Sequence, residues 1–308
     1  MDLMELATPT DLTDPTQLTD LRELRIATSD GFELGARLFA PRSRAVGAVL
    51  LVPAMGVPQR FYEPFARWLA SRNFRVMTFD YRGTGLSKQG PLAKVDADIL
   101  TWAQKDTAAV LDELARRAGD EPLTWIGHSL GGQIVPFVPN HTRAAKIITI
   151  ATGSGYWRHN AAPLRRKVWF FWFGAVPLTT PLFGYFPGRR LGMVGDLPRG
   201  VVWQWRRWCM NPDYAVGAEG AEVRTLFAEV ATPITSFSFT DDEMMSARSI
   251  STIHGHYSGA DKTMHRFTPS ELGVRKVGHF GFFRPEMEAP IWTRHVYGEL
   301  ARSSSTAM

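Results

Sequence analysis

The residues best suited to chemistry form the run Gly127-His128-Ser129-Leu130-Gly131-Gly132, in which one serine stands between glycines. Apolar residues at 123–126 precede the run and a new apolar segment begins at residue 133, which predicts a strand, a sharp turn and a helix. Glycines two residues before and two after a serine are typical of a turn so tight that a Cβ would collide with neighbouring backbone. Such a turn exposes the hydroxyl above a helix N-terminus, so the run predicts a nucleophilic serine, Ser129.

A serine hydroxyl needs a base to become reactive, and we predict His279 for that role. Residues 273–277 read as the last strand of the chain, and His279 follows them directly. The carboxyl end of that strand would place the imidazole beside Ser129.

The base in turn needs an acid, which we expect at the end of a strand between the serine and the histidine. Asp241 and Asp242 both follow the apolar segment 233–240, and either could orient the imidazole. The order Ser, Asp, His along the chain is the one that accompanies a strand–serine–helix turn.

Two backbone N–H groups are expected to stabilise the oxyanion that forms when the serine attacks an acyl carbon. The residue after the nucleophile, Leu130, supplies the first. The second is predicted at Met55, in the loop that follows the apolar segment 45–53.

Strand and helix patterns alternate along most of the chain, which predicts a mostly parallel sheet with helices on both faces. A hairpin is expected at 23–40, strands at 45–53, 74–80, 122–127, 146–150, 233–240 and 273–277, and helices at 59–73, 96–118, 246–254 and 291–301. We expect a loosely held arm at 1–20, an α/β core at 21–153 and 224–302, a helical insertion at 154–223 and a tail at 303–308.

The expected insertion differs in composition from the rest of the chain. It holds six of the ten tryptophans, and residues 153–213 contain nine Arg or Lys and two acids, a local charge of +7 in a chain of net charge +5. The aromatic residues are expected to line an apolar cleft over Ser129, and the arginines to bind an anionic part of the substrate. The candidate lining residues are Trp157, Trp169, Trp172 and Trp205. The alternative is that these aromatic residues form the core of the insertion and the arginines are solvated.

The composition is that of an ordinary globular enzyme, with 44% hydrophobic and 21% charged residues among 308. The single cysteine, Cys209, and the lack of a secretory signal pattern favour a soluble cytoplasmic protein. The longest apolar stretch, 168–176, is too short for a transmembrane helix, and no pattern indicates a nucleic-acid partner. His254 and His256 lack further ligands at metal-binding spacing, so no metal site is expected.

Two motifs with this spacing make the chain resemble the α/β-hydrolase superfamily over residues 20–152 and 230–302. Gly127–Gly132 is similar to the family's G-H-S-x-G-G turn, and residues 80–87, Asp-Tyr-Arg-Gly-Thr-Gly-Leu-Ser, are similar to its structural D-x-R-G-x-G-x-S signature. The whole chain looks most like bacterial hydrolases of the serine-aminopeptidase-like group. The resemblance implies an α/β-hydrolase fold with residues 154–223 as a cap.

The resemblance also bears on the acid and on the oxyanion loop. The family acid often stands four residues before a helix-opening proline, a place that Ser246 fills for Asp242. The family's small residue three positions before the acid favours Asp241 instead, because Ser238 holds that position. We favour Asp242 as the acid, with Asp241 as the alternative. The family's His-Gly pair in the oxyanion loop is replaced by Pro53-Ala54, and Pro136 should shorten the helix after Ser129.

These residues predict a serine hydrolase that cleaves a carboxylic ester or related acyl bond through Ser129, His279 and Asp242, without metal or organic cofactor. An acyltransferase would use the same three residues with an alcohol, amine or thiol in place of water. A non-catalytic ligand binder with this fold is the third possibility. The expected partner is a small acyl compound, hydrophobic and with an anionic group.

Overall fold

The computed structural model describes residues 19–305, with side chains as far as residue 301. The arm expected at 1–20 and the tail expected at 303–308 therefore lie mostly outside the described residues. Thr19 and Asp20 begin the first strand, and residues 303–305 end the last helix.

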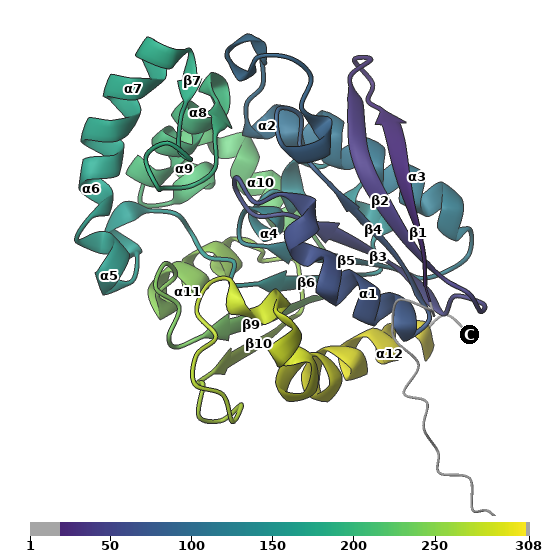
Figure 1. Cartoon of the computed structure of the whole chain (residues 1–308). Helices are drawn as coiled ribbons and strands as arrows, with labels where there is room; N and C mark the ends of the chain where they lie inside the picture. The colour runs from purple at the N-terminus through teal and green to yellow at the C-terminus, as the bar shows by residue number, and fades with distance from the viewer. Residues whose placement is uncertain (1–18, 306–308) are drawn as a thin grey trace, which may run out of the picture.

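An eight-stranded sheet crosses the molecule in the order β1-β2-β4-β3-β5-β6-β9-β10 (Figure 1). The first two strands form the predicted hairpin, β2 pairs antiparallel with β4, and all other neighbours are parallel. The strands are β1 (Thr19–Ala27), β2 (Glu33–Pro41), β3 (Gly47–Val52), β4 (Phe74–Phe79), β5 (Leu123–His128), β6 (Lys146–Ile150), β9 (Ile234–Phe239) and β10 (Lys262–Phe267). The predicted mostly parallel α/β sheet is confirmed, and the carboxyl ends of β3, β5 and β9 share one edge.

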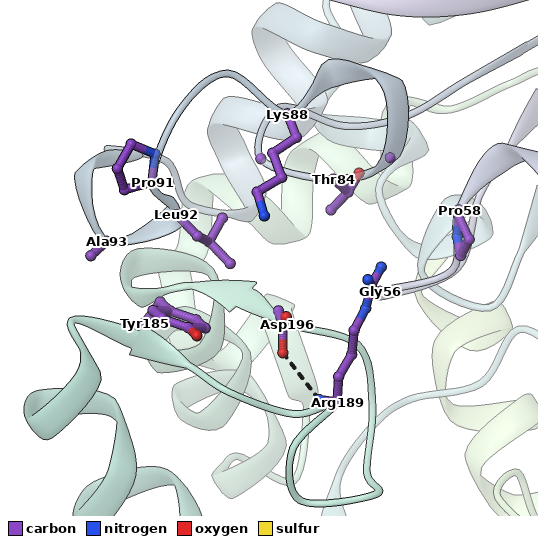
Figure 2. Close-up of a pocket in the computed structure, with 12 residues that line it drawn as sticks. Gly56, Pro58, Thr84, Lys88, Pro91, Leu92, Ala93, Tyr185, Arg189 and Asp196 are labelled. Carbon is purple, nitrogen blue, oxygen red and sulfur yellow. Dashed lines mark hydrogen bonds between the residues drawn. The ribbon is translucent and has the colours of Figure 1, made fainter.

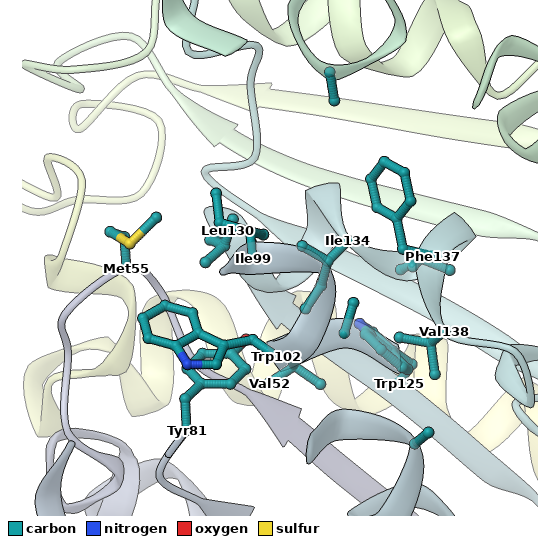
Figure 3. Packing of buried hydrophobic residues seen from close by; sticks show 14 of the residues in the cluster. Val52, Met55, Tyr81, Ile99, Trp102, Trp125, Leu130, Ile134, Phe137 and Val138 are labelled. Carbon is teal, nitrogen blue, oxygen red and sulfur yellow. The ribbon is translucent and has the colours of Figure 1, made fainter. Parts of the chain in front are cut away.

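Both faces of the sheet are buried under helices, because its central strands are apolar on both sides. In β3, Ala48, Leu50 and Val52 pack into one hydrophobic cluster, whereas Val49 and Leu51 pack into a second cluster on the other face. One face is covered by α1 (Glu63–Ser71), η12 (Glu288–Val296) and α12 (Tyr297–Ser305). The other is covered by η5 (Trp102–Thr107), α3 (Ala108–Ala118), α10 (Ala221–Glu229) and α11 (Ala247–His256). Tyr81 stacks on Trp102 within this second layer, with ring centroids 4.5 Å apart (Figure 3).

The turn at residues 80–87 joins β4 to the rest of the fold through polar contacts. The Asp80 carboxylate accepts hydrogen bonds from the backbone N–H groups of Gln59 and Leu86, both at 2.8 Å. Arg82 is buried between Asp106 and Asp30, with ion-pair distances of 2.6 and 2.8 Å. The residues of this second motif therefore have a structural role.

The predicted last strand at residues 273–277 is wrong. The last strand is β10 (Lys262–Phe267), a polar edge strand parallel to β9, and residues 268–278 form a loop that leads to His279. Val277 packs into the apolar cluster from this loop, so its burial does not require a strand.

The segment between β6 and β9 contains helices and one short two-stranded sheet, β7 (Tyr185–Phe186) with β8 (Leu197–Pro198). Its helical elements are η8 (Trp157–His159), α5 (Ala162–Arg165), α6 (Val168–Phe170), η9 (Phe171–Ala175), α7 (Val176–Phe183), α8 (Arg199–Met210), α9 (Tyr214–Glu219) and α10. Figure 1 shows α5, α6 and α7 along one flank of the molecule, away from the sheet. Part of the segment belongs to the main core, since Trp208 stacks on Phe137 with centroids 5.5 Å apart.

The glycines around Ser129 permit contacts that no side chain would allow. A Cβ on Gly131 would lie 2.2 Å from the carbonyl oxygen of Val52 in β3, and a Cβ on Gly127 would lie 2.4 Å from the Gly131 carbonyl carbon. Both obstacles are backbone atoms, which cannot rotate away. The turn is thus pressed against the central strands.

We expect Gly131→Ala to reduce the free energy of unfolding by more than about 2 kcal/mol, because β3 or the turn must move. Gly255→Ala is the matched control, since Gly255 lies in α11 with no atom within 4 Å of an added Cβ. The control should stabilise the protein by about 0.5–1 kcal/mol. Urea unfolding measures both variants, and equal stability of the two would contradict the close approach.

A buried histidine links α11 to the sheet. The ring nitrogens of His254 lie 2.9 Å from the Thr149 hydroxyl of β6 and 2.8 Å from the Ile250 carbonyl oxygen. Burial lowers the pKa of His254 from 6.5 to about 4, and nearby Lys262 acts in the same direction. The folded protein therefore holds this ring neutral where the unfolded chain would protonate it.

Folding stability should fall as the pH drops from about 6.5 to 4, because only the unfolded state binds a proton at residue 254 in that range. This group accounts for up to about 3 kcal/mol of the loss. We expect His254→Gln to show a correspondingly flatter dependence of unfolding free energy on pH, measured by urea titration at several pH values. Parallel curves for the two proteins would show that the folded state also protonates His254.

Candidate active site

Ser129 sits on a strained turn between β5 and α4 (Leu130–Gln133). Its backbone φ of 51° and ψ of −109° place a non-glycine residue in a region that costs energy. The turn is held by a hydrogen bond from Ser129 N–H to the Ile150 carbonyl oxygen at 2.9 Å and by one from the Thr152 hydroxyl to the Ser129 carbonyl oxygen at 3.1 Å. The helix after the serine ends at Gln133, so the predicted shortening ahead of Pro136 is confirmed.

His279 and Asp242 form a buried pair. The imidazole Nδ1 lies 2.9 Å from Asp242 Oδ2 and 3.2 Å from Oδ1, and the side chains are 2% and 1% exposed. A carboxylate can only accept a hydrogen bond, so Nδ1 carries a proton, and in the neutral ring Nε2 keeps its lone pair. A carboxylate in this position fixes the tautomer and the orientation of the imidazole ring.

The turn after β9 uses three successive carboxylates to place the loop that carries His279. Asp241 accepts a hydrogen bond from Val277 N–H at 2.8 Å, and Glu243 accepts one from His279 N–H at 3.2 Å. Asp242 Oδ1 also accepts hydrogen bonds from the N–H groups of the two residues that follow Glu243, at 2.7 and 2.8 Å. Of the two candidate acids, only Asp242 contacts the imidazole. Glu243 has no signal in the sequence, because its partner is a backbone group in a distant loop.

His128 joins three loops of the site. Its Nε2 lies 3.1 Å from the His279 carbonyl oxygen, which can only accept, so Nε2 carries the proton. Its Nδ1 then accepts a hydrogen bond from the Tyr62 hydroxyl at 2.9 Å, and that hydroxyl accepts one from Ala54 N–H at 2.8 Å. Burial holds the pKa of His128 well below its usual range, which keeps the ring neutral.

The two expected oxyanion donors lie beside the same cavity. Met55 and Leu130 lie at one end of the packed cluster in Figure 3 and both line the cavity that contains Ser129. Within residues 19–305, neither backbone N–H donates a hydrogen bond to another group. Leu130 is the first residue of α4, where a free N–H is the rule.

The cavity has a volume of about 610 Å³ and a mostly apolar wall. Ser129 and His279 both line it, although no hydrogen bond joins them; such contacts are often loose before substrate binds. Trp172 and Trp205 are in the wall, whereas Trp157 and Trp169 are not. The rest of the wall from the segment between β6 and β9 comprises Gly155, Asn160, Leu164, Lys167, Val168, Phe171, Gly192, Met193, Val194, Gly195 and Cys209.

A smaller pocket of about 280 Å³ lies behind the loop that carries Met55, between residues 83–93 and the β7–β8 connection (Figure 2). Lys88 and Arg189 line it, and the Arg189 N–H donates a hydrogen bond to Asp196 at 3.0 Å. Gly56 lines both pockets and packs against Gly195, so close that a Cβ on Gly195 would lie 2.5 Å from the Gly56 carbonyl oxygen. Backbone contact between these two loops therefore separates the pockets.

No group of three or more His, Cys, Asp or Glu side chains within residues 19–305 could hold a metal ion. No helix in that range is long and apolar enough to cross a membrane.

Comparison with known proteins relates this chain to hydrolases. A profile of the serine aminopeptidase S33 family matches residues 43–180. DcsB, solved with a substrate analogue, superposes with a TM-score of 0.62 at 16% identity over 92% of this chain and 99% of its own. A cold-adapted esterase from an Arctic intertidal metagenomic library gives 0.55 at 17% identity over 97% of each chain. A thermostable carboxyl esterase from Bacillus coagulans gives 0.59 at 14% identity over 80% of this chain and 90% of its own.

At these identities the superpositions establish the fold, and the S33 profile adds a match in sequence. The predicted α/β-hydrolase fold is confirmed. The chain has the α/β-hydrolase fold, and its residues 43–180 resemble the S33 serine aminopeptidase family.

Proposed function

We propose that the protein is a serine esterase in which Ser129 is the nucleophile, His279 the general base and Asp242 the orienting acid. The observation that carries the proposal is the His279–Asp242 pair, 2.9 Å apart, whose imidazole lines the same cavity as Ser129. A neutral imidazole with a free Nε2 can take the serine proton, and the carboxylate then stabilises the imidazolium.

The reaction proceeds in two halves. Ser129 Oγ attacks the acyl carbon while His279 Nε2 takes its proton, and the oxyanion is held by the N–H groups of Met55 and Leu130. His279 then returns the proton to the leaving alcohol, which departs and leaves an acyl-serine. Water attacks this ester with His279 again as base, which releases the carboxylic acid and restores Ser129.

The apolar wall supports an ester with a hydrophobic acyl group as the substrate. Trp172 and Trp205 meet edge to face, with centroids 4.9 Å apart, and form part of the wall. Lys167 is the one lysine or arginine of the wall among the described side chains. An anionic substrate group would therefore have a single nearby cation inside the cavity.

Ser129→Ala should abolish labelling by a fluorophosphonate probe and lower kcat/KM for p-nitrophenyl esters by about a thousandfold or more. Asp242→Asn should lower kcat to a similar degree, because the amide no longer holds the proton on Nδ1. Asp241→Asn is the matched control, since its side-chain oxygen can still accept from Val277 N–H; we expect a loss below about tenfold. Labelling of the Ser129→Ala protein would overturn the proposed nucleophile, and a larger loss for Asp241→Asn than for Asp242→Asn would overturn the proposed acid.

The cavity predicts a preference for acyl chains longer than acetyl. With p-nitrophenyl esters of increasing acyl length, kcat/KM should rise from the acetate ester, because each buried methylene contributes about 0.8 kcal/mol. It should fall once the acyl chain is too long to fit in the cavity. Leu164→Trp adds bulk to the wall and should move the optimum to shorter chains. Activity in the Ser129→Ala blank gives the background, and a preference for acetate in both active proteins would rule out an acyl chain in this cavity.

A further inference from the structure

The helical segment at 162–183 is apolar on two opposite faces. One row of side chains, spaced four residues apart, is buried, and a second row offset by two residues faces outward. The buried row is Val168, Trp172, Val176 and Thr180, and the large side chains of the outer row are Phe170, Leu178 and Leu182, which are 53%, 73% and 77% exposed. Trp169 and Phe173 widen the outer face, at 55% and 54% exposed.

The exposed apolar side chains are concentrated on this flank. Of the thirteen large hydrophobic residues exposed among the described residues, eight lie between residues 169 and 193. Single exposed apolar residues are normal on a soluble protein, whereas a contiguous group marks a surface that contacts another apolar phase. In Figure 1 the helices α5, α6 and α7 lie along an outer edge of the molecule.

The same flank carries unpaired positive charge. Arg158, Arg165, Arg166, Lys167 and Arg190 are exposed, and none forms an ion pair with a carboxylate of the described chain. Arg190 lies over the exposed Phe183 ring, 5.5 Å from its centroid, so a cation and an aromatic side chain are presented together. The two acidic residues between positions 153 and 213 have other partners. Asp196 accepts a hydrogen bond from the backbone N–H of Arg189, and Asp213 forms an ion pair with Arg224.

We propose that the outer face of residues 162–193 docks on an anionic lipid bilayer. Its leucine, phenylalanine and tryptophan side chains enter the boundary between head groups and acyl chains, and its arginines pair with lipid phosphates. The positive charge selects this occupant over a second copy of the chain, because a symmetric dimer through this face would oppose two cationic surfaces.

The position of the face gives docking a consequence for the cavity. Leu164, Lys167, Val168 and Trp172 belong to the same helical segment and line the cavity that contains Ser129. One helical layer therefore separates the bilayer from the cavity. Docking requires no catalysis, so it can be tested independently of the proposed esterase activity.

The test uses the full-length Ser129→Ala protein in vesicle flotation, which removes any effect of hydrolysis. We expect binding to phosphatidylcholine vesicles that contain about one third phosphatidylglycerol, and binding at least tenfold weaker to phosphatidylcholine alone, since each basic residue near the surface contributes roughly fivefold. Adding salt should weaken the binding to anionic vesicles.

Two variants separate the apolar and the charged contributions. Leu178→Ser with Leu182→Ser removes the two most exposed leucines, and Arg165→Gln with Arg166→Gln removes two cations; each pair should weaken vesicle binding by about tenfold or more. Leu226→Ser with Met264→Ser is the matched control, because these residues are 39% and 45% exposed on α10 and β10. It should bind vesicles as the parent protein does.

Urea unfolding of the same variants checks that they are folded. Failure of the parent protein to float with anionic vesicles, or equal binding by the Leu178/Leu182 variant and the control, would overturn the proposal. A dimer in solution that dissociates in the Leu178/Leu182 variant would also overturn it and identify a second copy as the occupant. None of these outcomes depends on whether Ser129 is a nucleophile.

Discussion

The hydrogen bonds on the two sides of the His128 ring hold together three loops that start from three different parts of the sheet. One nitrogen is tied through Tyr62 to Ala54 N–H, one residue before Met55, and the other to the backbone of His279. His128 itself precedes Ser129. A shift of any one of these loops would break a buried hydrogen bond, which costs about 1–3 kcal/mol, so the proposed nucleophile, base and oxyanion donor are positioned together.

This linkage works only while His128 is neutral. A proton on Nδ1 would leave the Tyr62 hydroxyl without its acceptor, and the charge would lie near His279, whose ring centroid is 5.2 Å away. Burial lowers the pKa of His128 well below its usual value, and the proximity of His279 lowers it further. The fold thus keeps a second positive charge away from the histidine that becomes an imidazolium during the proposed reaction.

The sequence predicted the parts of the site whose geometry is local. The glycines around Ser129 have one explanation, close backbone contact, and the structure places Gly131 against β3. The segment before His279 was wrongly predicted as a strand, because Val277, an apolar residue in a buried loop, resembles an apolar residue in a strand. Tyr62 and Glu243 were missed altogether, since their partners are backbone or ring atoms that only the folded chain brings near. The choice between Asp241 and Asp242 likewise depends on which carboxylate points towards the imidazole.

The segment at 162–183 leaves large apolar side chains exposed to water, which is energetically unfavourable. A helical segment with apolar side chains on opposite faces is normally buried on both, because each large side chain left in water forgoes about 1.5–3 kcal/mol of burial free energy. Here the inner row, including Val168 and Trp172, is covered by the core and the cavity wall, whereas Leu178 and Leu182 have no comparable cover within the described chain. Stability of the isolated molecule does not explain those two leucines, since polar residues at the same positions would leave the inner row unchanged. Their presence is accounted for by contact with another apolar phase, and the neighbouring arginines restrict that phase to one with negative charge at its surface.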